Sequence, residues 1–247
     1  MLPCPEKPAL PPDRGAEFDA YADGYDAGMD NPLKRLVGSS PADFLRVKAR
    51  LLVADLRRRF PGGASLLDYG CGTGSFLREL AAAGFDGPAA GCDVSDRMLA
   101  AARRGWPAGV APEVYHAGPG EDAARSGRFD AVVISAVLHH VEPADRPGLY
   151  RTLRLLLKPT GRLYVFEHNP WNPVTCWVVR HTRIDRNAIL VPAPELRAGL
   201  RAAGFGRLRT RYLMFVPPRL TPLLPLEACL RWLPLGGQYL VRAEPSG

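Results

Sequence analysis

The sequence predicts an α/β fold with a doubly wound, mainly parallel sheet of seven strands and an antiparallel last strand. Short apolar runs alternate with helical patterns between residues 65 and 167. The runs AVVI at 131–134 and LYVF at 163–166 are apolar on consecutive residues, as expected of strands that helices cover on both faces. A third indication is a glycine-rich turn, residues 70–74, that directly follows the first strand.

The first helix is expected within residues 39–60. Ser40 suits the N-cap, Pro41 the first helical position, and Asp43 the positive end of the helix. The later strands are expected at 65–70, 88–93, 113–116, 129–135, 161–167, 207–216 and 236–244, and the later helices at 75–84, 96–105, 143–157 and 194–205.

Composition narrows the class of protein. The net charge is +7, but the 32 basic residues are dispersed, so nucleic acid is not an expected partner. Five cysteines without a CxxC pair suggest neither a disulfide framework nor a zinc site, which favours a reducing, cytoplasmic setting. Prolines interrupt the N-terminal residues where a secretory signal needs an apolar segment, and no run has the roughly 18 apolar residues of a membrane span.

The glycine turn has the spacing Asp68-x-Gly70-x-Gly72-x-Gly74. A Walker loop needs a Gly-Lys-Ser/Thr sequence, which is absent, and a dinucleotide turn needs glycine where Ser75 stands. A second acid, Asp93, ends the next strand, at about the distance where a strand-helix-strand unit returns a carboxylate to a ribose diol. A plain packing turn is the alternative interpretation.

With these two motifs, the chain resembles the class I S-adenosylmethionine-dependent methyltransferases, whose fold is Rossmann-like, over about residues 17–243. The resemblance implies S-adenosylmethionine as cofactor, with its ammonium group at Asp68 and its ribose at Asp93. Where the family usually has an acid that receives the adenine amino group, this chain has Pro119, so that contact is expected from Glu121, Asp122 or the backbone. The remaining cofactor contacts are expected at Gly70, Cys71, Gly72, Gly74, Val94, Met98 and Ser135.

Residues after the fourth and fifth strands are expected to face the transferred methyl group, because ligands of open α/β sheets bind at the carboxyl ends of the strands. A hydroxyl acceptor must lose a proton, and an imidazole suits that step. His139 and His168 are the candidate proton acceptors, in that order; the alternative for His139 is a helix cap or support for the cofactor. Neither is expected to bind a metal, since no further ligand spacing accompanies them. Substrate contacts are expected at His140, Glu167, Asn169 and Trp171.

Residues 1–15 contain five prolines and are expected to be a disordered tail, with a single methyltransferase domain over 16–247. In related enzymes an N-terminal segment covers the cofactor; here residues 17–60 would form that helical lid. Its Tyr21 and Tyr25 are expected to contact the substrate, or only to pack. The leucine-rich, proline-broken insertion 217–235 is expected to be a second lid, with contact to a membrane or lipid-like acceptor as the alternative.

The EHNPWNP segment at 167–173 resembles a subgroup of small-molecule methyltransferases. The expected function is therefore methyl transfer to a small-molecule acceptor, as an O-methyltransferase of specialised metabolism. The alternative is a non-catalytic, S-adenosylmethionine-binding regulatory or interaction protein. The acceptor, the methylated atom and the oligomeric state are left open by the sequence.

Overall fold

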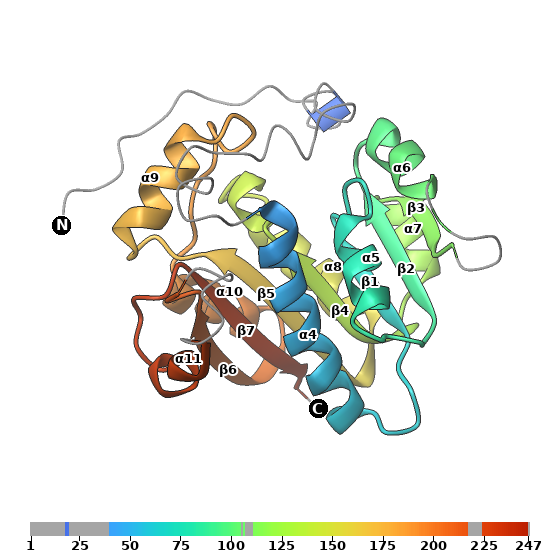
Figure 1. Ribbon diagram of the computed structural model, residues 1–247. Helices are drawn as coiled ribbons and strands as arrows, with labels where there is room; N and C mark the ends of the chain where they lie inside the picture. Colours follow the sequence, from blue (N-terminus) through green and yellow to red (C-terminus); the bar gives the residue numbers. More distant parts are fainter. Residues whose placement is uncertain (1–17, 20–39, 105, 107–110, 217–223, 247) are drawn as a thin grey trace.

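The computed structural model describes residues 18–19, 40–104, 106, 111–216 and 224–246, with only the backbone of 224–226. Its centre is a seven-stranded sheet in the order β3-β2-β1-β4-β5-β7-β6 (Figure 1). All neighbouring strands from β3 to β5 run parallel, and β7 is antiparallel to both β5 and β6. The predicted doubly wound sheet with an antiparallel last strand is confirmed.

The strands alternate with helices along the chain as far as β5. The strands are β1 Leu66–Tyr69, β2 Ala89–Asp93, β3 Glu113–His116, β4 Phe129–Ser135, β5 Leu157–His168, β6 Phe205–Leu213 and β7 Gln238–Pro245. The helices are α4 Pro41–Arg59, α5 Ser75–Ala82, α6 Asp96–Arg103, α7 Pro119–Ala124, the 3-10 turn η2 Leu138–His140, α8 Arg146–Leu156, α9 Pro173–His181, α10 Ala193–Ala202 and α11 Leu224–Leu230.

Two buried clusters hold helices on the two faces of the sheet. One contains Leu52 and Leu56 of α4 with Leu77 and Leu80 of α5, so these helices cover the face that is nearer in Figure 1. The other contains side chains of α8 and α10, which cover the opposite face. Strands β4 and β5 send fully buried side chains into both clusters, which explains their uninterrupted apolar runs.

Helix α4 begins as the sequence predicts. The Ser40 side chain accepts a hydrogen bond from the Asp43 backbone N–H, and the Asp43 carboxylate accepts one from the backbone N–H of Ser40. This is a complete capping box with Pro41 in the first turn. The cap fixes the start of α4 next to the carboxyl ends of the strands, where Pro41 lines the cavity described below.

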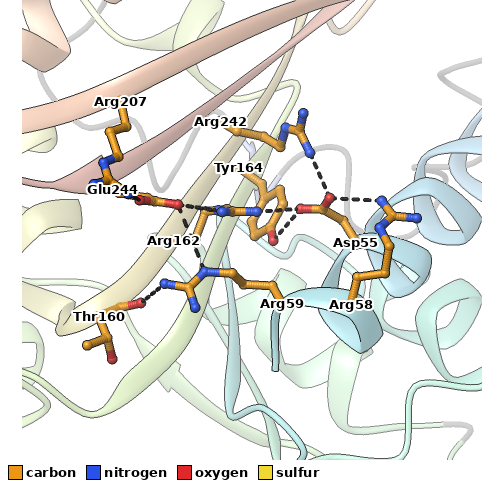
Figure 2. A network of polar contacts seen from close by, with 9 residues as sticks. All are labelled: Asp55, Arg58, Arg59, Thr160, Arg162, Tyr164, Arg207, Arg242 and Glu244. Atoms are coloured by element: carbon orange, nitrogen blue, oxygen red, sulfur yellow. Dashed lines mark hydrogen bonds and ion pairs between the residues drawn. The ribbon is translucent and has the colours of Figure 1, made fainter. Parts of the chain in front are cut away.

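A network of ion pairs ties the other end of α4 to the sheet (Figure 2). The Asp55 carboxylate accepts from Arg162 Nη1 at 2.9 Å, Arg242 Nη1 at 2.7 Å and the Tyr164 hydroxyl at 2.9 Å. Arg162 also donates to Glu244 on β7. Because these partners stand on β5 and β7, the network fixes α4 across the junction of the parallel and antiparallel parts of the sheet.

Some elements differ from the predictions. Helix α8 begins at Arg146 rather than near 143, and β5 begins at Leu157, before the predicted residue 161. Helix α9, which follows the EHNPWNP segment, was not predicted; Asn172 caps it by accepting from the Thr175 N–H. Residues 1–15 lie outside the described residues, so the expected tail stays a prediction. Among the helices that the structure describes, none is long and apolar enough to cross a membrane.

Candidate active site

A cavity of about 520 Å³ lies at the carboxyl ends of the strands. Its polar wall comes from β1 and its glycine turn, the end of β4, the end of β5 and the start of β7. Its apolar wall comes from the start of α4, from α9 and from the residues after β6. The lining includes Lys48, Asp68, Gly70, Ser135, His140, His168, Asp185 and Gln238 on the polar side, and Phe44, Leu45, Phe76, Val174, Val178, Ile184, Met214, Phe215 and Val216 on the apolar side.

The glycine turn after β1 needs its glycines. Gly70, Gly72 and Gly74 have φ of 78°, 52° and 76°, in the left-handed region that side chains disfavour. Gly70 and Cys71 line the cavity, as do Thr73 and Ser75, whereas Gly72 and Gly74 lie outside its described lining. The turn therefore brings its backbone close to one side of the cavity.

Asp68 lies in β1, just before this turn. It is 2% exposed, and its Oδ2 has no hydrogen-bond partner among the described residues. Burial and the nearby charge of Asp93 raise its pKa to about 7, although the ammonium group of Lys48 opposes the change. Lys48 of α4 is 3% exposed and donates to Ser135 Oγ at 3.1 Å. A buried carboxylate with an unpartnered oxygen fits the cationic ammonium group of S-adenosylmethionine.

Asp93, at the end of β2, joins the turn to α6. Its Oδ2 accepts from the Gly72 N–H at 2.8 Å and its Oδ1 from the Ser95 N–H at 3.0 Å. These bonds fix the orientation of the carboxylate, and its contact with the ribose stays a prediction. Val94 is 42% exposed beside it, while Met98 is buried at 1%.

The two acids expected to receive the adenine amino group have other partners. The Glu121 carboxylate is exposed and accepts from Arg125 Nη1 at 2.6 Å, on the outside of α7. Asp122 is 3% exposed and accepts from the Tyr69 hydroxyl at 3.2 Å, with its Oδ1 buried and without a partner among the described residues. Of the two, only Asp122 lies inside the fold.

His139 is held between two carboxylates. Its Nδ1 lies 2.7 Å from Glu167 Oε2 and its Nε2 lies 3.5 Å from Asp185 Oδ1. Glu167 Oε1 accepts from the backbone N–H groups of Val137 and Leu138. Burial alone would lower the pKa of His139, but the two carboxylates raise it to about 10. His139 is 1% exposed and lies outside the described lining of the cavity.

His168 and His140 do line the cavity. Burial, reinforced by the charge of His139, lowers the pKa of His168 to about 3, so its imidazole is neutral near pH 7. Its Nδ1 lies 3.4 Å from Gln238 Nε2 on β7. The ring of Phe18 packs edge-on against His140 with centroids 5.2 Å apart, which places this part of the predicted N-terminal lid beside the cavity.

Three expected substrate contacts lie outside the described lining of the cavity. Glu167 alternates with His168 along β5 and therefore points to the opposite face of the sheet, toward His139. Asn169 is 1% exposed and donates to the backbone carbonyls of Pro234 and Gly236. Trp171 packs against the core cluster of α8 and α10. The structure thus gives these residues positions outside the described lining, and the prediction that they touch the substrate stays a prediction.

Other expectations lie partly or wholly outside the described chain. Tyr21 and Tyr25 fall among the residues that the structure does not describe. Of the insertion 217–235, only residues 224–235 are described, and none of these lines the cavity. Residues on either side of the insertion, Met214–Val216 and Gly237–Gln238, do line it.

The sequence reasoning missed seven polar residues of the lining: Lys48, Thr73, Ser75, Asn172, Thr175, Asp185 and Gln238. Three of them carried a usable signal, because Thr73 and Ser75 stand in or next to the glycine turn and Asn172 belongs to the EHNPWNP segment. Lys48 was one charged residue within an amphipathic helix, and Asp185 and Gln238 belong to segments without a recognised motif. The fold alone brings them to the cavity.

The fold and this site define a class I S-adenosylmethionine-dependent methyltransferase. The family model described as "Methyltransferase domain" matches residues 42–208. The chain belongs to this methyltransferase family. The predicted family and the predicted cofactor, S-adenosylmethionine, are confirmed.

Similar proteins include three bacterial methyltransferases. The chain is 36% identical over 49% of its length to the dTDP-3-amino-3,6-dideoxy-alpha-D-glucopyranose N,N-dimethyltransferase of Streptomyces fradiae. It is 33% identical over 57% to the ubiquinone biosynthesis O-methyltransferase of Xanthomonas axonopodis pv. citri, and 36% identical over 66% to the demethylmenaquinone methyltransferase of Beutenbergia cavernae. These matches span 44%, 54% and 62% of the relatives' own lengths.

Among solved structures, a S-adenosylmethionine-dependent methyltransferase from Archaeoglobus fulgidus has a TM-score of 0.56 at 19% identity. The match covers 85% of this chain and 97% of the other. At this identity the likeness shows the fold, which is the methyltransferase sheet described above.

Proposed function

We propose that this chain transfers the methyl group of S-adenosylmethionine to an oxygen atom of an apolar small molecule of specialised metabolism. The observation that carries the proposal is the single cavity that joins Asp68 and the glycine turn to an apolar wall and to His168. A volume of about 520 Å³ is in the usual range of small-molecule sites, and the methionine part of the donor takes a share of it. The acceptor is therefore small.

On the donor side, Asp68 would receive the ammonium group and Lys48 the carboxylate of the methionine part. These two side chains form a pair of opposite charges at the buried end of the cavity. Asp93, fixed by the N–H groups of Gly72 and Ser95, would accept both ribose hydroxyls. These residues would hold the donor by its methionine part and its ribose.

On the acceptor side, the neutral imidazole in the lining supports oxygen. When a sulfonium transfers its methyl group to a hydroxyl, the acceptor loses a proton, and the positive charge passes from the sulfonium to the base that takes that proton. A neutral amine needs no base for the transfer itself, so a neutral His168 beside the acceptor supports a hydroxyl, and the apolar wall supports an apolar acceptor. The relatives named for ubiquinone biosynthesis and demethylmenaquinone support an apolar acceptor, whereas the sugar N,N-dimethyltransferase is the contrasting case.

His168, rather than His139, is the proposed proton acceptor, because His168 lines the cavity and His139 is buried behind it. Gln238 Oε1 has no hydrogen-bond partner among the described residues. If the amide group turns so that Oε1 accepts from His168 Nδ1–H, this oxygen gains a partner and His168 Nε2 keeps its lone pair. Gln238 would then be the residue that sets the tautomer of the base.

Two measurements test the proposal. Calorimetry with S-adenosylmethionine should show binding, and isotope-labelled donor should pass its methyl group to members of a panel of phenols and hydroquinones. His168→Ala should lower kcat by about 10²–10⁴-fold while donor binding is unchanged. His181→Ala, an exposed histidine on α9, is the matched control and should behave as wild type.

Comparing the metabolites of a strain with and without the gene then identifies the natural acceptor, as a pair of masses that differ by one methylene. If the chain binds the donor but His168→Ala leaves every measured transfer unchanged, His168 is not the base. If the donor binds and no acceptor is methylated in either experiment, the chain is the non-catalytic binding protein that the sequence left as the alternative.

A further inference from the structure

Two histidines and one aspartate form a cluster at the cavity. His139 and His140 of η2 and Asp185, in the segment after α9, each offer one atom, and these three atoms lie within 4.8 Å of one another. Asp185 Oδ1 is 3.5 Å from Nε2 of His139 and 3.5 Å from Nε2 of His140. We propose that this cluster is a binding site for a divalent transition-metal ion, for which Zn²⁺ is the reference.

The tautomer of His139 is the first argument. Glu167 Oε1 accepts two backbone N–H groups and its Oε2 faces His139 Nδ1 at 2.7 Å, so Nδ1 is the protonated nitrogen. This leaves Nε2, buried and without a hydrogen bond among the described residues, aimed at an oxygen of Asp185. A lone pair facing a carboxylate is unfavourable unless a cation, either a proton or a metal ion, lies between them.

The distances favour a metal ion. A proton shared between imidazole and carboxylate draws the two atoms to about 2.7–2.9 Å. Two ligands bound at about 2.1 Å to one tetrahedral ion lie about 3.4 Å apart. Both separations to Asp185 match the second value. Two imidazoles and one carboxylate form a donor set typical of Zn²⁺ and of other divalent transition metals.

The surroundings resemble those of metal sites whose ions keep an open position. A carboxylate that accepts from the distal N–H of a metal-binding histidine, as Glu167 does for His139, is the usual support for such a ligand. His140 and Asp185 line the cavity, while His139 lies behind them. An ion held by these three residues would thus lie at the wall of the cavity, where a further ligand could reach it.

The role of the ion, unlike its binding, rests on the proposed function. An acceptor hydroxyl bound to the ion would lose its proton more readily, because a metal ion lowers the pKa of a bound oxygen. The O–H bond breaks, the proton passes to His168, and the oxygen lone pair then forms the new C–O bond as the C–S bond of the donor breaks. The residues that hold the ion would thus favour an acceptor that binds through oxygen.

Equilibrium dialysis of the full chain against Zn²⁺, with tight binding of one ion expected, tests the site without any acceptor. His140→Ala and Asp185→Asn should each weaken that binding by more than about 100-fold, and Glu167→Gln by about 10–100-fold. The cysteines are present in all of these variants, so any zinc they hold cancels in the comparison. His181→Ala is the control and should bind as the wild type does.

Calorimetry with S-adenosylmethionine on the same samples separates the two proposals, because an unchanged donor affinity shows that a variant is folded. Cobalt provides a second readout, since Co²⁺ in a four-coordinate site of this kind absorbs visible light, and His140→Ala should abolish that band. If wild type binds no Zn²⁺, or the variants bind it as well as wild type does, the cluster holds only a proton and the proposal fails, whatever the enzyme does with its donor.

Discussion

Asp68→Asn should separate cofactor binding from the stability of the free protein. The substitution keeps the shape of a side chain that is 2% exposed and removes its charge. In the free protein that charge is unfavourable: burial raises the pKa of Asp68, the charge of Asp93 raises it further, and Lys48 only partly compensates, which leaves the pKa at about 7. The ammonium group of bound S-adenosylmethionine would supply the positive charge that this carboxylate lacks in the free protein.

The magnitude follows from the pKa. A change from 3.8 to about 7 corresponds to on the order of 4 kcal/mol. The folded chain holds this proton more tightly than the unfolded chain does, so the free energy of unfolding falls as the pH rises from about 4 to about 7 and then levels off. Asp68→Asn has no such loss. At pH 8 without cofactor it should therefore be the more stable protein, by up to that amount, and the advantage should vanish near pH 4.

Cofactor binding should change in the opposite direction. A hydrogen bond to a charged group is worth about 1.5–3 kcal/mol, so Asp68→Asn should bind S-adenosylmethionine about 10- to 150-fold more weakly. Affinity of the wild type should also fall below pH 7, as Asp68 takes up its proton. Urea denaturation at pH 8, 6 and 4, with calorimetry at each pH, measures both effects. Asp86→Asn, an exposed aspartate before β2, is the control. If Asp68→Asn binds the cofactor as wild type does, or is the less stable protein at pH 8, the reasoning is wrong.

Three further substitutions test the scaffold around the site. Asp55→Ala removes the carboxylate that Arg162 and Arg242 share and should lower the free energy of unfolding by about 3 kcal/mol in urea at pH 7. Burial opposes the change, but hydrogen bonds and guanidinium charges lower the pKa of Asp55, so this loss should shrink once the pH falls below about 4 and the wild-type carboxyl protonates; an unchanged loss at pH 3 would contradict the ion-pair account. Gly91→Ala puts a Cβ 2.8 Å from Cys71 Sγ and should cost about 1–3 kcal/mol together with cofactor affinity, and unchanged affinity would show that the turn adapts. Ser40→Ala removes the N-cap of α4 and should cost about 1 kcal/mol in thermal unfolding, which Ser40→Asn restores.

The donor half of the site was predictable because its signals are local. The run of apolar residues in β1, the glycines at 70, 72 and 74, and the acid that ends β2 stand within one strand-helix-strand unit. A turn with three positive φ angles admits few residues other than glycine, so the sequence shows the backbone conformation directly. The sequence therefore predicted that Asp68 lies near the end of β1, before the turn, and that Asp93 ends β2, and their contacts with the cofactor stay a prediction.

The acceptor half was not predictable in the same way. Neighbours in sequence after β5 were expected to act together, but alternation along a strand sends Glu167 to one face and His168 to the other. Asp185 and Gln238 reach the cavity from distant segments that only the fold brings together. The order of the two candidate bases also depends on burial, which the sequence did not show for His139.

The two sides of β5 explain how one strand can serve both proposals. His168, on the side of the cavity, needs to be neutral if it is to take a proton, and burial keeps it so. The positive charge of His139, whose ring centroid lies 5.0 Å from that of His168, also lowers the pKa of His168, whereas the charges of Asp185 and Glu167 oppose this effect. A metal ion adds what a proton does not: an open coordination position toward the acceptor, which makes the hydroxyl more acidic and thereby allows a weakly basic imidazole to remove its proton. The low basicity of His168 is thus compatible with catalysis only when the acceptor oxygen is itself activated.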